Sequence, residues 1–191
     1  LGLPCSEVAA DVTPEGFAVV EASSFQLTRC ERFHPRIAVL LNLGTNHLDR
    51  HQSRAEYLRA KARIFQRQEF SDWAVLNGFR PEIVALAPEL KARRVWFSKN
   101  QDNPPEFHLA EASLGALNEN AQAVLQVARV LGIPDPVSWQ AVRAFRGLEH
   151  RLEWAGTVRG VAFVNDSKST TPDSFLYALS RVSAPVVCIL G

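Results

Sequence analysis

Short apolar runs of strand length alternate with segments of helical periodicity along most of this chain. The runs expected to be strands are residues 17–20, 37–43, 73–76 and 94–97. The segments expected to be helical are residues 23–33, 53–68, 81–92, 121–131 and 137–145. Alternating strands and helices bury their apolar faces best as a sheet covered by helices. The pattern therefore predicts an α/β fold with a mostly parallel sheet.

The pattern restarts after a linker expected at residues 146–150. Its elements are strands near 152–158, at 161–164 and at 186–190, and a helix at 172–181. A β-hairpin followed by a βαβ-like unit indicates the start of a second, Rossmann-like α/β domain. We therefore expect a central domain over residues 1–148 and the beginning of a C-terminal domain over residues 149–191.

Composition argues against several classes of protein. The net charge of +1 gives no electrostatic reason to bind nucleic acid. No apolar run reaches the ~18 residues of a membrane span, so we expect no membrane insertion. The cysteines Cys5, Cys30 and Cys188 are odd in number and widely spaced, which indicates reduced thiols in a cytoplasmic protein. The chain lacks methionine and both ends look cut, so we expect a piece of a longer protein.

Lys61 has an unusual position for a lysine. Ser53, with Glu56 three residues later, is a capping-box pattern for the start of its helix. Helical spacing places Lys61 in the middle of an arc formed by Tyr57, Leu58, Ile64 and Phe65. Desolvation disfavours a lysine charge, so two interpretations are open. The side chain extends its ammonium to water, or it is held neutral, ion-paired or chemically modified.

Glu21 and His47 each follow an expected strand. Ligands of open α/β sheets gather outside the carboxyl ends of strands, and both residue types bind divalent cations. The alternative is a capping glutamate and a hydrogen-bonded histidine. Lys61 favours the metal site, because a neutral lysine amine near a divalent cation can add CO₂ and become a carbamate, which is an oxygen ligand.

A second polar cluster follows the expected strand at 161–164. Asp166 could bind a ribose hydroxyl and Lys168 an anionic group, although a strand-to-helix turn has the same composition. Arg151 could place its guanidinium on a phosphate, although a lone arginine at a domain junction is often structural. The sequence contains no GxxxxGK[ST] phosphate loop, so a cradle for ATP phosphates would have to lie upstream of Leu1.

Six short segments together carry a family resemblance. They are residues 1–4, 21–27, 42–51, 57–65, 147–151 and 165–170. In sequence and order they resemble the Mur ligase family. The run Glu-Ala-Ser-Ser-Phe-Gln-Leu at 21–27 is typical of the member that adds D-glutamate to UDP-N-acetylmuramoyl-L-alanine. The resemblance implies a three-domain cytoplasmic ligase of peptidoglycan precursor synthesis, which uses ATP and Mg²⁺ to form an acyl phosphate; we expect a monomer.

The resemblance implies a metal centre with two Mg²⁺ ions. Glu21 and His47 would be magnesium ligands, and a carbamylated Lys61 would support the second ion. Ser23 would lie near the muramoyl-alanine. Lys61, His47 and Lys168 would be the catalytic residues.

The resemblance also implies contacts to the nucleotide and to the amino acid. Asn120 would contact adenine, Arg151 an ATP phosphate and Asp166 the ribose. Lys168 and Thr170 would face the incoming D-glutamate.

Two departures from the family pattern are present. Asn46 stands where the family usually has aspartate, which removes a negative charge beside the expected metal. The GxHNxxN-like adenine segment is blurred at 115–120, where either Asn118 or Asn120 could take the asparagine role and Asn120 is preferred. One alternative is another Mur or folylpolyglutamate-type ligase, against which the Ser-Ser-Phe-Gln run argues. The other is a non-catalytic nucleotide-binding relative.

Overall fold

The larger part of the chain is built on a three-stranded parallel sheet. The structure, a computed structural model, describes residues 3–44, 51, 53–98, 103–108, 118–183 and 185–190. The strands are β1 (Ile37–Leu40), β2 (Trp73–Asn77) and β3 (Arg93–Phe97), in that order across the sheet. Both neighbouring pairs are parallel, with Trp73 opposite Ile37 on one side and Arg93 on the other. The predicted α/β class and parallel sheet are confirmed.

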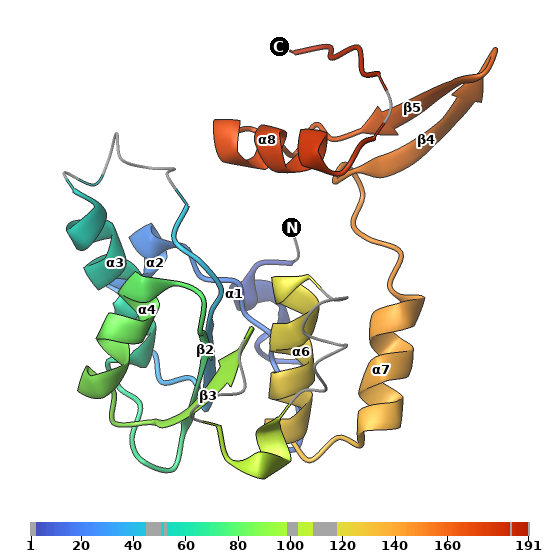
Figure 1. The fold of residues 1–191 in the computed structure, drawn as a ribbon. Coiled ribbons are helices and arrows are strands. Elements are labelled where there is room, and N and C mark those ends of the chain that lie inside the picture. Colours follow the sequence, from blue (N-terminus) through green and yellow to red (C-terminus); the bar gives the residue numbers. More distant parts are fainter. Residues whose placement is uncertain are drawn as a thin grey trace.

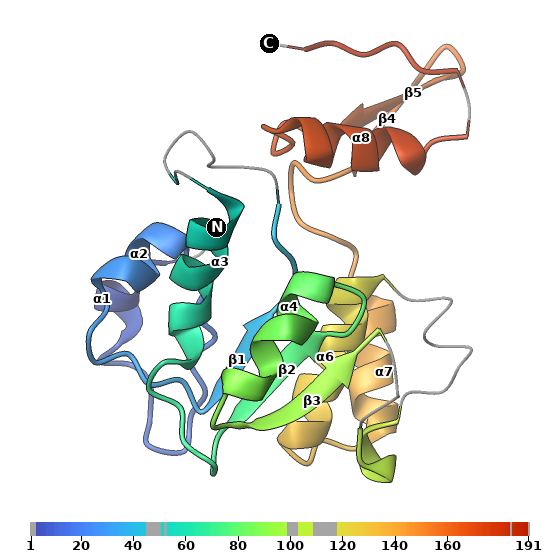
Figure 2. The same cartoon turned by 60° about the vertical axis from the view of Figure 1, so that its left-hand side comes forward.

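Helices cover both faces of this sheet. In chain order, the α-helices of the described residues are α1 (Cys5–Val8), α2 (Ser24–Arg29), α3 (Arg54–Ala62), α4 (Pro81–Leu86), α6 (Glu119–Val130), α7 (Asp135–Ala144) and α8 (Pro172–Ser180). Short 3-10 turns are η1 (Arg63–Phe65), η2 (Ala87–Glu89) and η3 (Pro105–Phe107). Figures 1 and 2 show α3 and α4 on one side of the sheet and α6 on the other, with α7 against α6. The predicted helices are thus present, and α3 with η1 accounts for the one expected at 53–68.

Side-chain alternation along the strands sorts the core onto the two faces. On the face of α3 and α4, Leu76 and Trp96 pack with Phe65 and Ile83. On the face of α6, Val75 and Phe97 pack with Ala123. Burial on both faces is what a parallel sheet needs, since neither face can be left to water.

Two of the predicted strands were wrong. Residues 17–20 and 186–190 lie in neither a helix nor a strand. Val19 is 99% exposed, and Val187 and Ile189 are each 94% exposed. An apolar run becomes a strand only where a neighbour completes its hydrogen-bond ladder and packs on its side chains, and these two segments lie outside both sheets.

A second, smaller unit follows α7. The antiparallel hairpin of β4 (Glu153–Val158) and β5 (Val161–Asn165) is followed by α8, as predicted. Figure 1 shows this unit apart from the parallel sheet, joined to it by the single stretch after α7. Within the described residues, Ala178 is the one buried hydrophobic residue beyond Ala144. The domain boundary expected at residue 148 stays a prediction.

Two further observations concern the whole chain. The three cysteines are free and exposed. Among the described helices, none is both long and apolar enough to cross a membrane.

Candidate functional site

Ser23 starts helix α2 and is exposed. Its Oγ accepts a hydrogen bond from the Gln26 N–H (3.2 Å), and the Gln26 Oε1 accepts one from the Ser23 N–H (2.8 Å). This reciprocal capping box satisfies N–H groups that the first turn leaves unpaired. The residue expected near the muramoyl-alanine is therefore held in a fixed orientation at the end of a helix.

His51 is buried between α2 and α3. Its Nε2 lies 3.0 Å from the Ser24 Oγ, and the two residues are 5% and 3% exposed. The ring stacks on Phe25 at 5.2 Å with an interplanar angle of 7°, and it lies 5.1 Å from the Tyr57 ring. The sequence placed His51 in a family segment but gave it no role, because its partners lie on two separate helices.

Lys61 lies one helical turn beyond Tyr57 on α3. Its Nζ is 5.2 Å from the centroid of the Tyr57 ring, which is the distance of a cation–π contact. The side chain is half-buried rather than enclosed. This arrangement does not support a carbamate, because the described neighbour of the amine is an aromatic ring.

The predicted metal ligands are not brought together in the described part of the chain. Glu21 is exposed, while His47 and the neighbouring Asn46 lie outside the described residues. Across the ranges that the structure describes, no group of three or more His, Cys, Asp and Glu residues could hold a metal ion. Glu21 and Lys61 do not by themselves complete a magnesium centre, and the third predicted ligand, His47, lies outside the described residues.

A hydrogen-bond network ties the carboxyl end of β2 to the start of α6. The fully buried Asn77 donates from Nδ2 to the Leu41 carbonyl and to the Glu119 carboxylate, both at 2.8 Å. Its Oδ1 accepts from the Phe79 N–H at 2.9 Å. The Arg80 guanidinium binds both Glu119 oxygens, at 2.9 and 3.1 Å. The first turn of α6 is thus fixed at the sheet edge where α/β proteins bind ligands.

This first turn of α6 contains both candidate adenine contacts. The Asn118 Oδ1 accepts from the Ala121 N–H at 2.8 Å and so caps the helix. Asn120 is exposed on the same turn. The capping bond uses the Asn118 carbonyl oxygen but not its amide N–H groups, so the sequence-based preference for Asn120 stays a prediction.

Three residues of the second polar cluster lie on two adjoining loops. The Asp166 carboxylate accepts from the Leu152 N–H (3.0 Å) and from the Ser169 hydroxyl, and the Lys168 N–H donates to the His150 carbonyl (3.0 Å). These bonds join the loop that contains Arg151 to the loop after β5. Asp166 therefore bridges the two loops, and its proposed contact with a ribose stays a prediction.

The loop around Arg151 has an uncommon backbone. His150 and Leu152, on either side of it, have φ angles of 64° and 47°, in the left-handed region that non-glycine residues rarely occupy. Such residues cost about 1 kcal/mol or more each and persist where the surroundings hold them. Here the Glu153 carboxylate accepts from the His150 N–H at 2.8 Å, and Asp166 holds Leu152. Arg151 itself is exposed at the tip of this constrained loop.

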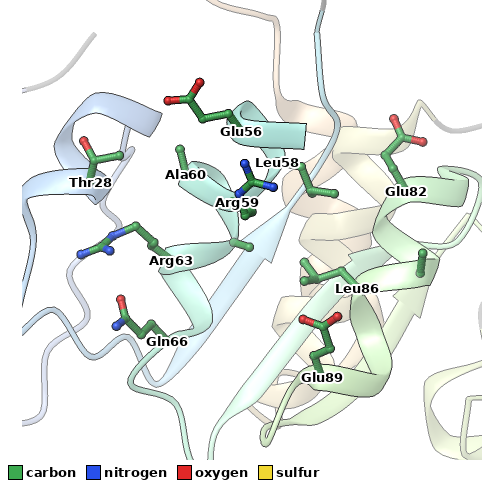
Figure 3. A pocket seen from close by; sticks show the side chains of 12 residues that line it. Thr28, Glu56, Leu58, Arg59, Ala60, Arg63, Gln66, Glu82, Leu86 and Glu89 are labelled. Atoms are coloured by element: carbon green, nitrogen blue, oxygen red, sulfur yellow. The ribbon is translucent and has the colours of Figure 1, made fainter. Parts of the chain in front are cut away.

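A shallow pocket of about 700 Å³ lies between α3 and α4, with Thr28 of α2 at its rim (Figure 3). Its charged lining includes Arg59, Arg63, Glu82 and Glu89. None of the predicted site residues that the structure describes lines this pocket. The pocket is therefore separate from the predicted site.

The fold and its polar sheet edge define a general class of protein. A parallel sheet with helices on both faces and polar side chains at its carboxyl edge belongs to the α/β proteins that bind ligands at that edge. Among solved structures, MurF from Acinetobacter baumannii matches with a TM-score of 0.63 at 18% identity, covering 78% of this chain and 38% of that one. That identity supports the shared fold alone.

Sequence comparison identifies the family. The family described as "Mur ligase middle domain" matches residues 5–128, so the chain belongs to the Mur ligase family. Curated UDP-N-acetylmuramoylalanine–D-glutamate ligases from Desulfitobacterium hafniense (strain Y51) and Oleidesulfovibrio alaskensis are 39% and 42% identical. Each alignment covers 100% of this chain but 47% and 42% of the relative. The chain thus spans about half the length of the curated relatives it matches.

Proposed function

We propose that this chain is part of an ATP-dependent ligase that adds D-glutamate to UDP-N-acetylmuramoyl-L-alanine in peptidoglycan precursor synthesis. One observation carries the proposal: relatives named for this reaction match the chain from end to end at 34–42% identity. The matched length contains the middle-domain segment and the start of a second α/β unit. A longer protein would supply the remaining substrate contacts.

The proposed reaction has two steps. A carboxylate oxygen of the muramoyl-alanine attacks the γ-phosphorus of ATP, and the bond to the β–γ bridging oxygen breaks to release ADP. The amine of D-glutamate then attacks the acyl phosphate, loses a proton, and expels inorganic phosphate as the amide forms. ATP with Mg²⁺ belongs to the proposal, and the ions would neutralise charge on the phosphates when bound.

On the substrate side, Ser23 is proposed to contact the muramoyl-alanine, and Glu21, His47 and Lys61 to form the magnesium and catalytic group. Support comes from the packing of α2 beside α3, which places the Ser23 cap and Lys61 on adjacent helices (Figure 2). The carbamate on Lys61 stays a prediction from the family resemblance.

On the nucleotide side, the start of α6 and the loops next to β4 and β5 are proposed to contact ATP and the amino acid. Asn120 would contact adenine, Arg151 a phosphate and Asp166 the ribose, with Lys168 and Thr170 toward D-glutamate. Support comes from the exposed Asn120 at the sheet edge and from the bonds that join the Arg151 loop to the Asp166 loop.

A panel of amino acids tests the proposal in the full-length protein. Phosphate release from ATP is followed with UDP-N-acetylmuramoyl-L-alanine and Mg²⁺, adding D-glutamate, L-glutamate, L-lysine or diaminopimelate separately. We expect release with D-glutamate alone. Release with a different amino acid would assign the protein to another reaction of the family, and no release with any would favour a non-catalytic relative.

A further inference from the structure

One buried histidine takes part in the contact between α2 and α3. His51 is in hydrogen-bond distance of Ser24, the first residue of α2, and its ring lies between Phe25 of α2 and Tyr57 of α3. Neither the sequence nor the proposed reaction assigns it a function. Two residues that His51 contacts, however, lie directly beside proposed site residues. Ser24 follows the helix cap Ser23, and the Tyr57 ring contacts the Lys61 ammonium.

The hydrogen bond makes this contact directional. Stacking of His51 on Phe25 would tolerate rotation and sliding of the ring, because aromatic contacts depend weakly on orientation in the ring plane. The bond between Ser24 Oγ and His51 Nε2 does not tolerate rotation of the ring. Both groups are buried, and each would lose its hydrogen-bond partner if the ring turned. A phenylalanine could fill this space but could not fix the orientation.

We propose that His51 is a positioning residue that holds the Ser23 end of α2 in register with Lys61 on α3. The bond to Ser24 fixes the imidazole, the imidazole fixes the Tyr57 ring by contact, and the ring lies under the Lys61 ammonium at 5.2 Å. The effect on turnover rests on the proposed ligase function, while the effect on Lys61 does not.

Two variants remove the same bond from opposite ends in the full-length protein. His51→Phe keeps the ring and loses Nε2, and Ser24→Ala loses the hydroxyl. Ser138→Ala is the matched control, because Ser138 is also buried and hydrogen-bonded but lies in α7. If His51→Phe does not fold, Ser24→Ala carries the test.

The first readout is kinetic. We expect each variant to lower kcat with D-glutamate roughly tenfold, as misplacement of reacting groups does, with the KM for ATP nearly unchanged. The double variant should be no slower than the single ones, because both changes remove one bond. A purely structural histidine would lower Tm and leave kcat at the level of Ser138→Ala, which would overturn the proposal.

The second readout needs no activity. Acetylation of Lys61 by an N-hydroxysuccinimide ester is measured by peptide mass spectrometry, with the exposed Lys91 as internal reference. We expect acetylation of Lys61 relative to Lys91 to rise about threefold in both variants, the factor that corresponds to loss of a weak cation–π contact. An unchanged ratio would overturn the proposal. A changed ratio in a protein without ligase activity would instead keep the positioning role and reject the proposed function.

Discussion

At the scale of single residues, Asp72 shows how a buried carboxylate stays charged. It is 7% exposed, and its Oδ2 accepts from the His34 Nε2 (2.7 Å) and from the Glu69 N–H (2.8 Å). Burial, the largest single influence, would by itself raise the pKa of Asp72. The hydrogen bond from the Glu69 N–H and the contact with His34 together outweigh burial and hold this pKa below its ordinary value of 3.8. The carboxylate fixes the turn that leads into β2.

Asp72→Asn should therefore destabilise the chain in a pH-dependent way. The folded-state pKa is lowered, so the stabilisation is present above pH 3.8 and is lost as the pH falls through the folded-state value. We expect the free energy of unfolding to drop by about 1–2 kcal/mol at neutral pH. Urea titrations of both proteins at neutral pH and at about pH 3 measure the difference. A loss of equal size at the two pH values would contradict this account, and the exposed Glu149→Gln provides the control.

At the scale of elements, the buried Asn77 joins β2, the residue after β1 and the start of α6. Its amide serves three partners, and one of them, Glu119, is itself held by Arg80. Helix and strand propensity and hydrophobic periodicity do not predict this hydrogen-bond network, because it depends on side chains from three segments that meet only in the folded chain.

Asn77→Leu should cost about 2–3 kcal/mol, since the Leu41 carbonyl and one Glu119 oxygen would lose a buried donor. The matched change Asn120→Leu, on an exposed position of α6, should alter the free energy of unfolding by less than about 0.5 kcal/mol. Equal effects of the two substitutions in urea titrations would show that the network does not fix α6.

The sequence predicted most elements because their signals are local. Strands β1 to β3 and helices such as α6 follow from residue spacing and from stop signals such as Gly132. The strands predicted at residues 17–20 and 186–190 are absent from the structure, because an apolar run needs a neighbouring strand that residue spacing cannot reveal. For the same reason, helical spacing left two interpretations of Lys61 open, and it gave His51 no role, since the contacts of both depend on how α2 and α3 pack.

At the scale of the whole molecule, the core and the second unit are separable. The buried hydrophobic residues of the described chain lie between Leu27 and Ala128, with Ala178 the exception. On the hairpin, Trp154 and Phe163 are 63% and 49% exposed. The parallel-sheet unit therefore takes almost none of its apolar burial from the second unit.

A chain that ends at Phe145 should unfold at nearly the same temperature as the chain of 191 residues. We expect Tm values within about 2 °C by near-ultraviolet circular dichroism, because little apolar surface is removed from the core. A chain that ends at residue 118 provides the control and should not fold, since it lacks Leu125 and Ala123 of α6. Loss of the cooperative transition in the chain that ends at Phe145 would show that the two units depend on each other.

An isotope experiment gives the most direct test of the proposed ligation through an acyl phosphate. UDP-N-acetylmuramoyl-L-alanine labelled with ¹⁸O in its alanyl carboxylate is converted by the full-length protein with ATP and D-glutamate. Because the phosphoryl group joins a carboxylate oxygen and leaves with it, we expect one ¹⁸O atom in each inorganic phosphate formed, by mass spectrometry. Phosphate without the label would show that ATP is hydrolysed by water or that the carboxylate is activated in another way, and would contradict the account.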